Sequence, residues 1–147
     1  MRTTRATPVP EPVRVTLPDG RTLLAAIDGV LHNRQELAAN LERSGWPWRP
    51  DEGDAGLAAR LLARDGWAAP GQLEGGFALA VWESTGTLWL VNLEDGTRAR
   101  VDRNPNAAPM RPSFSHDGAW IAYARPEDDR PTAAVWLYEV ATGKRTQ

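Results

Sequence analysis

A strand, a turn and the start of a helix follow one another in the stretch Thr22-Leu23-Leu24-Ala25-Ala26-Ile27-Asp28-Gly29-Val30-Leu31-His32-Asn33-Arg34-Gln35-Glu36-Leu37. Its first six residues predict a buried strand, and Asp28-Gly29 predicts the turn that ends it. Asn33, with Glu36 three residues later, resembles a capping box and predicts the start of a helix. This change from strand to helix favours an α+β fold.

The flanking sequence supplies further elements. Val13, Val15 and Leu17 alternate with polar residues before a Pro-Asp-Gly turn, so residues 13–27 are expected to form a β-hairpin. The first helix is expected to end at Gly45. A second helix is expected to begin near Asp54, acting as the N-cap, and to end at residues 65–66. Later strands are predicted at residues 77–82, 88–93, 98–101, 120–124 and 134–140.

We expect two helices packed on an antiparallel sheet that continues into a β-propeller-blade-like meander. The predicted units are a flexible Pro-rich arm (residues 1–12), an α+β unit (13–83) and a β unit (84–147). Each large side chain buried in the core contributes about 1.5–3 kcal/mol before entropy is subtracted. The expected core residues are Ile27, Leu37, Leu41, Leu57, Leu61, Leu62, Phe77, Leu79, Val81 and Trp89.

Composition excludes several classes of function. The sequence holds no cysteine and two histidines, which excludes disulfides, thiolate metal sites, a cysteine nucleophile and a His-rich metal cage. A net charge of −2 with interspersed signs gives no electrostatic reason to expect nucleic acid or a membrane surface as partner. Without a signal-like or membrane-spanning apolar run, the sequence predicts a cytoplasmic protein that needs no cofactor or metal.

The second half contains an internal repeat. Residues 88–98 resemble residues 135–145, with Trp89 matching Trp136 and Gly96 matching Gly143. Residues 77–80 resemble residues 121–124 at a similar spacing. A period of roughly 40–50 residues with several strands per unit is typical of propeller blades.

Residues 20–83 resemble the central part of the glutaminase domain of class II glutamine amidotransferases, among them asparagine synthetases and lasso-peptide cyclases. The matching segments are Asp19-Gly20-Arg21, Ala26-Ile27-Asp28-Gly29-Val30-Leu31-His32-Asn33-Arg34-Gln35-Glu36-Leu37, Gly53-Asp54 and Gln72-Leu73-Glu74-Gly75-Gly76-Phe77-Ala78-Leu79-Ala80-Val81-Trp82-Glu83. In that family an N-terminal cysteine attacks the glutamine amide. A strand-end Asn-Gly pair stabilises the oxyanion, and a later Asp holds the substrate amine.

The resemblance implies that Asp28 and Gly29 occupy the oxyanion position and that Asp54 occupies the amine-binding position. The attacking cysteine is missing, and Asp28 replaces the donor Asn, although a carboxylate donates to an oxyanion only when it is protonated. We therefore expect a vestigial substrate pocket of Asp28, Gly29 and Asp54 without catalytic residues. Asp28 as a turn former and Asp54 as an N-cap remain the structural alternative.

Residues 85–147 resemble the repeat of Tol-type and tricorn-type β-propellers. The matching residues are Pro112-Ser113-Phe114-Ser115-His116-Asp117-Gly118-Ala119-Trp120-Ile121-Ala122-Tyr123-Ala124, followed by Trp136-Leu137-Tyr138 and Thr142-Gly143-Lys144. Such propellers serve as filters or binding platforms, and a closed one needs roughly four to eight blades.

The sequence thus predicts a non-catalytic glutaminase-like scaffold joined to a propeller repeat and acting in binding or assembly. The expected partner is a protein or a second copy, bound through an exposed strand edge. The alternative is a fragment or subunit of an asparagine synthetase- or lasso cyclase-like amidotransferase that needs a partner chain. Trp46, Trp48 and Trp67 are possible binding aromatics.

Overall fold

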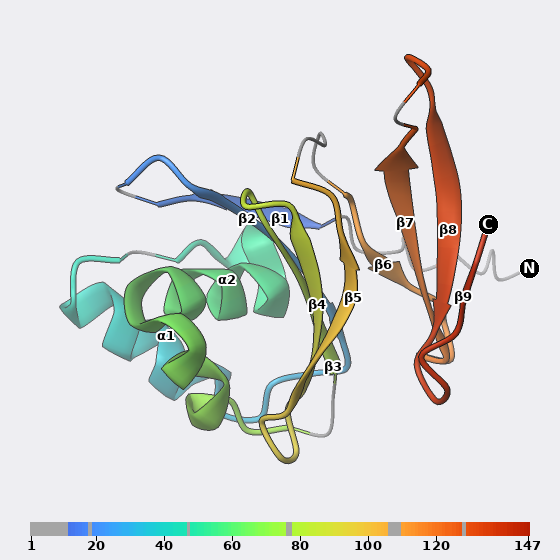
Figure 1. The fold of residues 1–147 in the computed structure, drawn as a ribbon. Coiled ribbons are helices and arrows are strands. Elements are labelled where there is room, and N and C mark those ends of the chain that lie inside the picture. The colour runs from blue at the N-terminus through green and yellow to red at the C-terminus, as the bar shows by residue number, and fades with distance from the viewer. Residues whose placement is uncertain (1–11, 18, 47, 76–77, 106–109, 128) are drawn as a thin grey trace, which may run out of the picture.

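Two antiparallel sheets and a layer of helices are stacked on one another. The structure, a computed structural model, describes residues 12–17, 19–46, 48–75, 78–105, 110–127 and 129–147. The helices cover one face of a five-stranded sheet, and a four-stranded sheet covers the other face (Figure 1). The predicted mixture of helices and antiparallel sheet is confirmed.

The five-stranded sheet has the order β1-β2-β3-β4-β5. The predicted hairpin forms its first two strands, with Val15 opposite Leu23. β2 then pairs with β3, so Ala25 lies opposite Val81, and Val81 lies opposite Trp89 of β4. The bounds are β1 (Val13–Thr16), β2 (Thr22–Asp28), β3 (Ala78–Glu83), β4 (Thr87–Asn92) and β5 (Arg98–Arg103).

The helical layer consists of α1 (Arg34–Arg43), η1 (Pro50–Glu52), α2 (Gly53–Asp65) and η2 (Gly66–Gln72). α1 buries Leu37 and Leu41, which lie one turn apart, and α2 buries Leu57 and Leu61 in the same way. These stripes pack on the sheet face that carries the odd-numbered residues of β2 and β3. The predicted helices and their amphipathic faces are therefore confirmed.

The start of α1 differs from the predicted capping box. Asn33 is the N-cap residue, but its side chain makes no capping hydrogen bond. Its Nδ2 donates to the Gln72 carbonyl at 2.8 Å, and its Oδ1 accepts from the Glu74 amide at 3.1 Å. Asn33 therefore ties the helix start to the segment before β3 instead of closing its own first turn.

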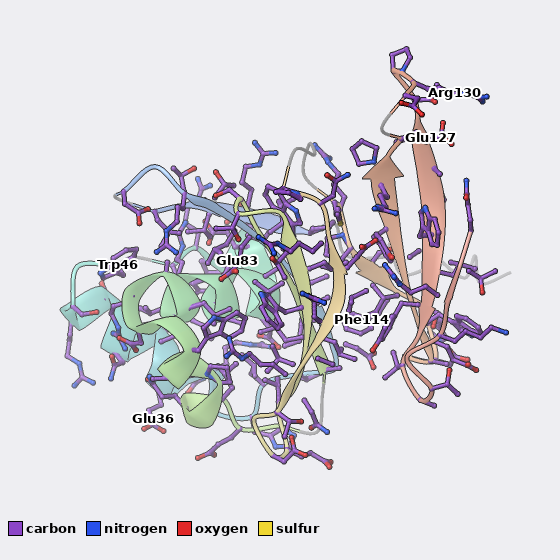
Figure 2. The ribbon with its side chains drawn as sticks, viewed as in Figure 1. Glu36, Trp46, Glu83, Phe114, Glu127 and Arg130 are labelled. Carbon is purple, nitrogen blue, oxygen red and sulfur yellow. The ribbon has the colours of Figure 1, made fainter. Side chains whose placement is uncertain are left out.

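The second sheet is a four-stranded meander of β6 (Ser113–Phe114), β7 (Trp120–Pro126), β8 (Ala133–Glu139) and β9 (Arg145–Thr146). Ile121, Tyr123 and Tyr138 pack against Leu24 and Leu88 of the first sheet, which forms a second core. Figure 2 shows Phe114 between the two sheets. The expectation of one main core was incomplete, because β2, β3 and β4 bury both faces. Phe77 lies outside the described residues.

The predicted boundary between residues 83 and 84 falls in the turn from β3 to β4, inside the five-stranded sheet. The division into units stays a prediction. Of the arm at residues 1–12, only Pro12 lies within the described residues. No helix in the described part of the chain is long and apolar enough to cross a membrane.

The sequence repeat is also present in the backbone. In the turn after β4, the Gly96 amide donates to Asn92 at 2.8 Å and the Asn92 amide donates to Thr97 at 2.9 Å. After β8, the equivalent Gly143 amide donates to Glu139 at 2.8 Å, and the Glu139 amide donates to Lys144 at 2.9 Å. Each repeat also stacks an arginine on its tryptophan, Arg98 on Trp89 and Arg145 on Trp136. The turns from β4 to β5 and from β8 to β9 are therefore built in the same way.

Candidate functional site

Asp28 and Gly29 form the end of β2. Gly29 has φ 116°, a left-handed conformation that side chains rarely adopt, so a glycine is required for the turn. Alternate residues of β2 face opposite sides, and Asp28 shares the face of Leu24 and Ala26, which is covered by the second sheet. The Asp28 carboxylate approaches Gly118 in the turn from β6 to β7 so closely that a Cβ there would collide with Oδ2.

A cavity of about 440 Å³ opens beside Asp28. Its polar lining includes Asn92, Glu94 and Arg98 from β4, β5 and the turn between them. Two carboxylates and one amide could hold a small polar molecule there, whereas the Arg98 guanidinium stacks on Trp67 and Trp89. Asp54 is not among the lining residues.

Asp54 lies on the helical side of the first sheet, in the first turn of α2, and is 9% exposed. Its Oδ2 accepts the Leu31 amide at 2.9 Å, and Arg34 donates to both carboxylate oxygens at 2.5 and 3.0 Å. Hydrogen bonding to Asp54 raises the pKa of the Arg34 guanidinium. Asp54 therefore ties the loop after β2 to α2.

The predicted N-cap role of Asp54 was wrong, because Glu52 is the N-cap of α2 and Asp54 lies within the helix. The structure places Asp28 and Asp54 on opposite faces of the first sheet and does not bring them into one cavity. A substrate amine that approached Asp54 would meet a carboxylate already bound by Arg34 and Leu31. A role of Asp28, Gly29 and Asp54 in substrate binding stays a prediction.

The three tryptophans proposed as binding aromatics, Trp46, Trp48 and Trp67, all pack against the core on the helical side. Figure 2 shows Trp46 on that side of the molecule, away from the second sheet. The Trp48 indole donates to the Gly53 carbonyl at 2.9 Å. The Trp67 ring meets Trp89 edge to face at 5.8 Å, and the Arg98 guanidinium covers it at 4.2 Å.

The described residues contain no group of three or more His, Asp and Glu side chains placed to hold a metal ion. Arginines are candidate site residues that the sequence patterns did not predict. Besides Arg34 on α1, they include three arginines of β5, namely Arg98, Arg100 and Arg103. Their alternation with small and acidic residues along β5 was the available signal.

Comparison with known proteins gives a family match. The glutamine amidotransferase domain family matches residues 12–97, which is more than half of the chain. None of the curated proteins compared with the chain matches it. One similar solved structure is the allosteric regulatory enzyme of purine biosynthesis, with 15% sequence identity and a TM-score of 0.48. That similarity covers 92% of this chain and 30% of the other chain, so this chain spans less than a third of its length.

Proposed function

Because the chain belongs to the glutamine amidotransferase domain family, we propose that it is a glutaminase-like scaffold that does not cleave glutamine and that acts in assembly. One observation carries the proposal. Asp28 and Asp54, which resemble the oxyanion and amine positions of the family, lie on opposite faces of the first sheet, and Asp54 is already bound by Arg34. The sequence also contains no cysteine to attack an amide.

The test is the release of ammonia from glutamine by the purified chain, measured in an enzyme-coupled assay. The expected result is no more ammonia than in a protein-free blank. Ammonia release that scales with protein concentration and disappears in the Asp54→Ala variant would overturn the proposal. The variant separates intrinsic activity from a contaminating glutaminase.

The second candidate is a part of a larger amidotransferase assembly in which another chain supplies the nucleophile. The family match over residues 12–97 favours it. Under this alternative the isolated chain is also silent, but ammonia appears when a cysteine-bearing partner chain is added.

The assembly surface in our proposal is the outer face of the second sheet, which we take as one propeller-type blade. The choice of this surface is supported by the internal repeat, which makes β8 equivalent to β4. Leu88 and Leu90 of β4 are 0% and 9% exposed because the second sheet covers them. Their equivalents in β8, Val135 and Leu137, are 64% and 40% exposed. The edges of the second sheet offer less, because its edge strands β6 and β9 are two residues each, and short edges pair poorly.

A second copy of this chain is the occupant that we propose. Cross-strand pairing puts Ala122 beside Leu137 and Ala124 beside Val135, so an apolar patch without charge spans β7 and β8. Two such patches can meet about a two-fold axis without like-charge repulsion, and the small alanines allow two sheets to approach closely. Within one molecule, the equivalent face of the first sheet, which carries Leu88 and Leu90, is already covered by the second sheet.

Analytical ultracentrifugation over a range of concentrations tests this surface. The wild-type chain should dimerise, and Val135→Lys should weaken the dimer at least about tenfold by burying a charge. Val30→Lys is the matched control, since Val30 is 55% exposed in the loop after β2. A wild-type chain that stays monomeric, or equal effects of the two substitutions, would overturn the proposed surface.

A further inference from the structure

An arginine-lined cavity of about 570 Å³ lies where β5 of the first sheet meets β7, β8 and β9 of the second. Four of its lining residues are arginines, namely Arg100, Arg103, Arg125 and Arg145, and the lining contains one carboxylate, that of Asp102. The whole chain carries a net charge of −2. This concentration of positive charge is therefore local and opposite in sign to the rest of the molecule.

The cavity depends on a β-bulge. Leu88 pairs with Asp102 while its neighbour Trp89 pairs with Arg100, which leaves Val101 as the extra residue of β5. A bulge lets two consecutive side chains face the same side of a sheet. Val101 accordingly packs in the core between the sheets, and Asp102 beside it contacts the second sheet.

Asp102 organises the floor of this cavity. It is 5% exposed, accepts the Tyr123 hydroxyl at 2.9 Å and the Arg103 amide at 2.7 Å, and pairs with Arg145 at 2.8 Å. Arg125 Nε lies 3.6 Å from the same carboxylate and is buried without a hydrogen-bond partner in the described structure. One carboxylate thus holds two guanidinium groups in place but neutralises only one charge.

The other two arginines are free to bind. Both side chains are exposed, and neither Arg100 nor Arg103 has a side-chain hydrogen bond or ion pair with the residues that the structure describes. A guanidinium group carries five N–H donors in a planar fork that matches the oxygens of a phosphate or carboxylate. The Asp102 contacts use few of these donors, so most of them remain available at the cavity.

We propose that this cavity binds a small molecule that carries more than one phosphate or carboxylate group. Arg125 and Arg145, held by Asp102, form the preorganised part of the site, which lowers the entropy lost on binding. Arg100 and Arg103 lie opposite Trp89 and Thr87 on the face of β5 that is turned toward the helices, and β5 is an edge strand, so their long side chains reach the ligand around the open edge of the sheet. A single charge would leave the site with uncompensated positive charge, so multiply charged anions are favoured.

Isothermal titration calorimetry tests the proposal with inorganic pyrophosphate as the phosphate probe and citrate as the carboxylate probe. We expect saturable binding of at least one probe, and the tighter one identifies the ligand chemistry. The Arg100→Gln/Arg103→Gln variant should weaken that binding at least about tenfold. These side chains have no described partners, so the fold should persist, and the melting temperature checks this.

The matched control is Arg14→Gln/Arg43→Gln, which removes the same charge from exposed positions on β1 and α1. Its affinity for the probe should stay within about twofold of the wild type. The proposal fails if neither probe binds more tightly than about 1 mM, or if both double variants weaken binding equally. Equal weakening would mean that overall charge attracts the anion and that the cavity does not.

Discussion

Removal of the Asp54 carboxylate should destabilise the chain mainly through the loss of one buried backbone partner. In Asp54→Ala, the Leu31 amide loses its acceptor, and Leu31 is 3% exposed. A buried donor left unsatisfied costs about 1–3 kcal/mol. Loss of a negative charge from the first turn of α2 adds about 0.3–1 kcal/mol. The expected loss in the free energy of unfolding is therefore about 1–4 kcal/mol.

Substitution of Arg34, the other partner of the ion pair, should reduce the free energy of unfolding by less. Arg34 is 47% exposed, so solvent can hydrate its guanidinium once the partner is gone. Arg34→Gln should cost less than Asp54→Ala, because the Leu31 amide keeps its acceptor and the Gln amide can still donate to the Asp54 carboxylate, of which only 7% is exposed. Asp54→Asn should lie between the two variants, because its amide oxygen can still accept from Leu31.

Urea unfolding at one fixed protein concentration measures these differences, since any dimer would make stability depend on concentration. Asp51→Ala is the control, because Asp51 is also an acid near the start of α2 but is 75% exposed. If Arg34→Gln costs as much as Asp54→Ala, the ion pair and not the buried amide governs stability. If Asp54→Ala costs no more than Asp51→Ala, Asp54 does not tie α2 to the loop.

Two further predictions concern the contact between the sheets. Gly118→Ala should destabilise by up to about 1 kcal/mol more than Gly96→Ala, since both glycines have φ near +70° but only the Cβ at Gly118 would force the Asp28 side chain to turn away. Asp28→Ala in the Gly118→Ala background should remove that excess in urea unfolding. Burial and the hydrogen bond to Asp102 raise the pKa of Tyr123 from 10.0 to about 12, so its stabilising effect should be complete below pH 10 and be lost as the pH rises through 12. An ultraviolet phenolate titration in which Tyr123→Phe removes no transition near pH 12 would contradict this.

Short-range patterns predicted most of the elements. The spacing of Leu37 and Leu41 and the Ala- and Leu-rich run of α2 require only neighbouring residues, and both helices formed as expected. The hairpin of β1 and β2 follows in the same way from alternation and one turn. Such elements can be predicted because their decisive interactions lie within one or two turns of chain.

The capping predictions were wrong where a distant hydrogen-bond partner competed with a local one. Asn33 could have closed its own helix, but its side chain bonds Gln72 and the Glu74 amide, about 40 residues away. Asp54 likewise accepts the Leu31 amide, 23 residues earlier. Both distant amides would otherwise be left without partners as the chain leaves or enters the sheet, and a sequence motif does not reveal this competition.

The second core and the arginine cavity were beyond a sequence prediction for a related reason. A strand such as β2, apolar on both faces, indicates that something covers each face but not what covers it. The cavity then brings together residues of β5, β7 and β9 through a bulge at Val101. Neither the bulge nor the stacking of the two sheets has a local signature in the sequence.

The repeat was the most informative pattern, and its two copies also explain why the positive cavity occurs once in the described structure. Arg98 and Arg145 occupy the same repeat position, each above a tryptophan. In the first copy the tryptophan faces the helical layer, where Arg98 stacks on Trp67 as well. In the second copy the tryptophan packs toward the first sheet, and Arg145 therefore reaches Asp102. A guanidinium stacked on an aromatic ring can pack against the helical layer or against the other sheet. In both places the ring supplies apolar contact while the charge stays at the edge. The layer that packs against each copy of the repeat, and not the repeat sequence, therefore determines whether the arginine contributes to a binding cavity.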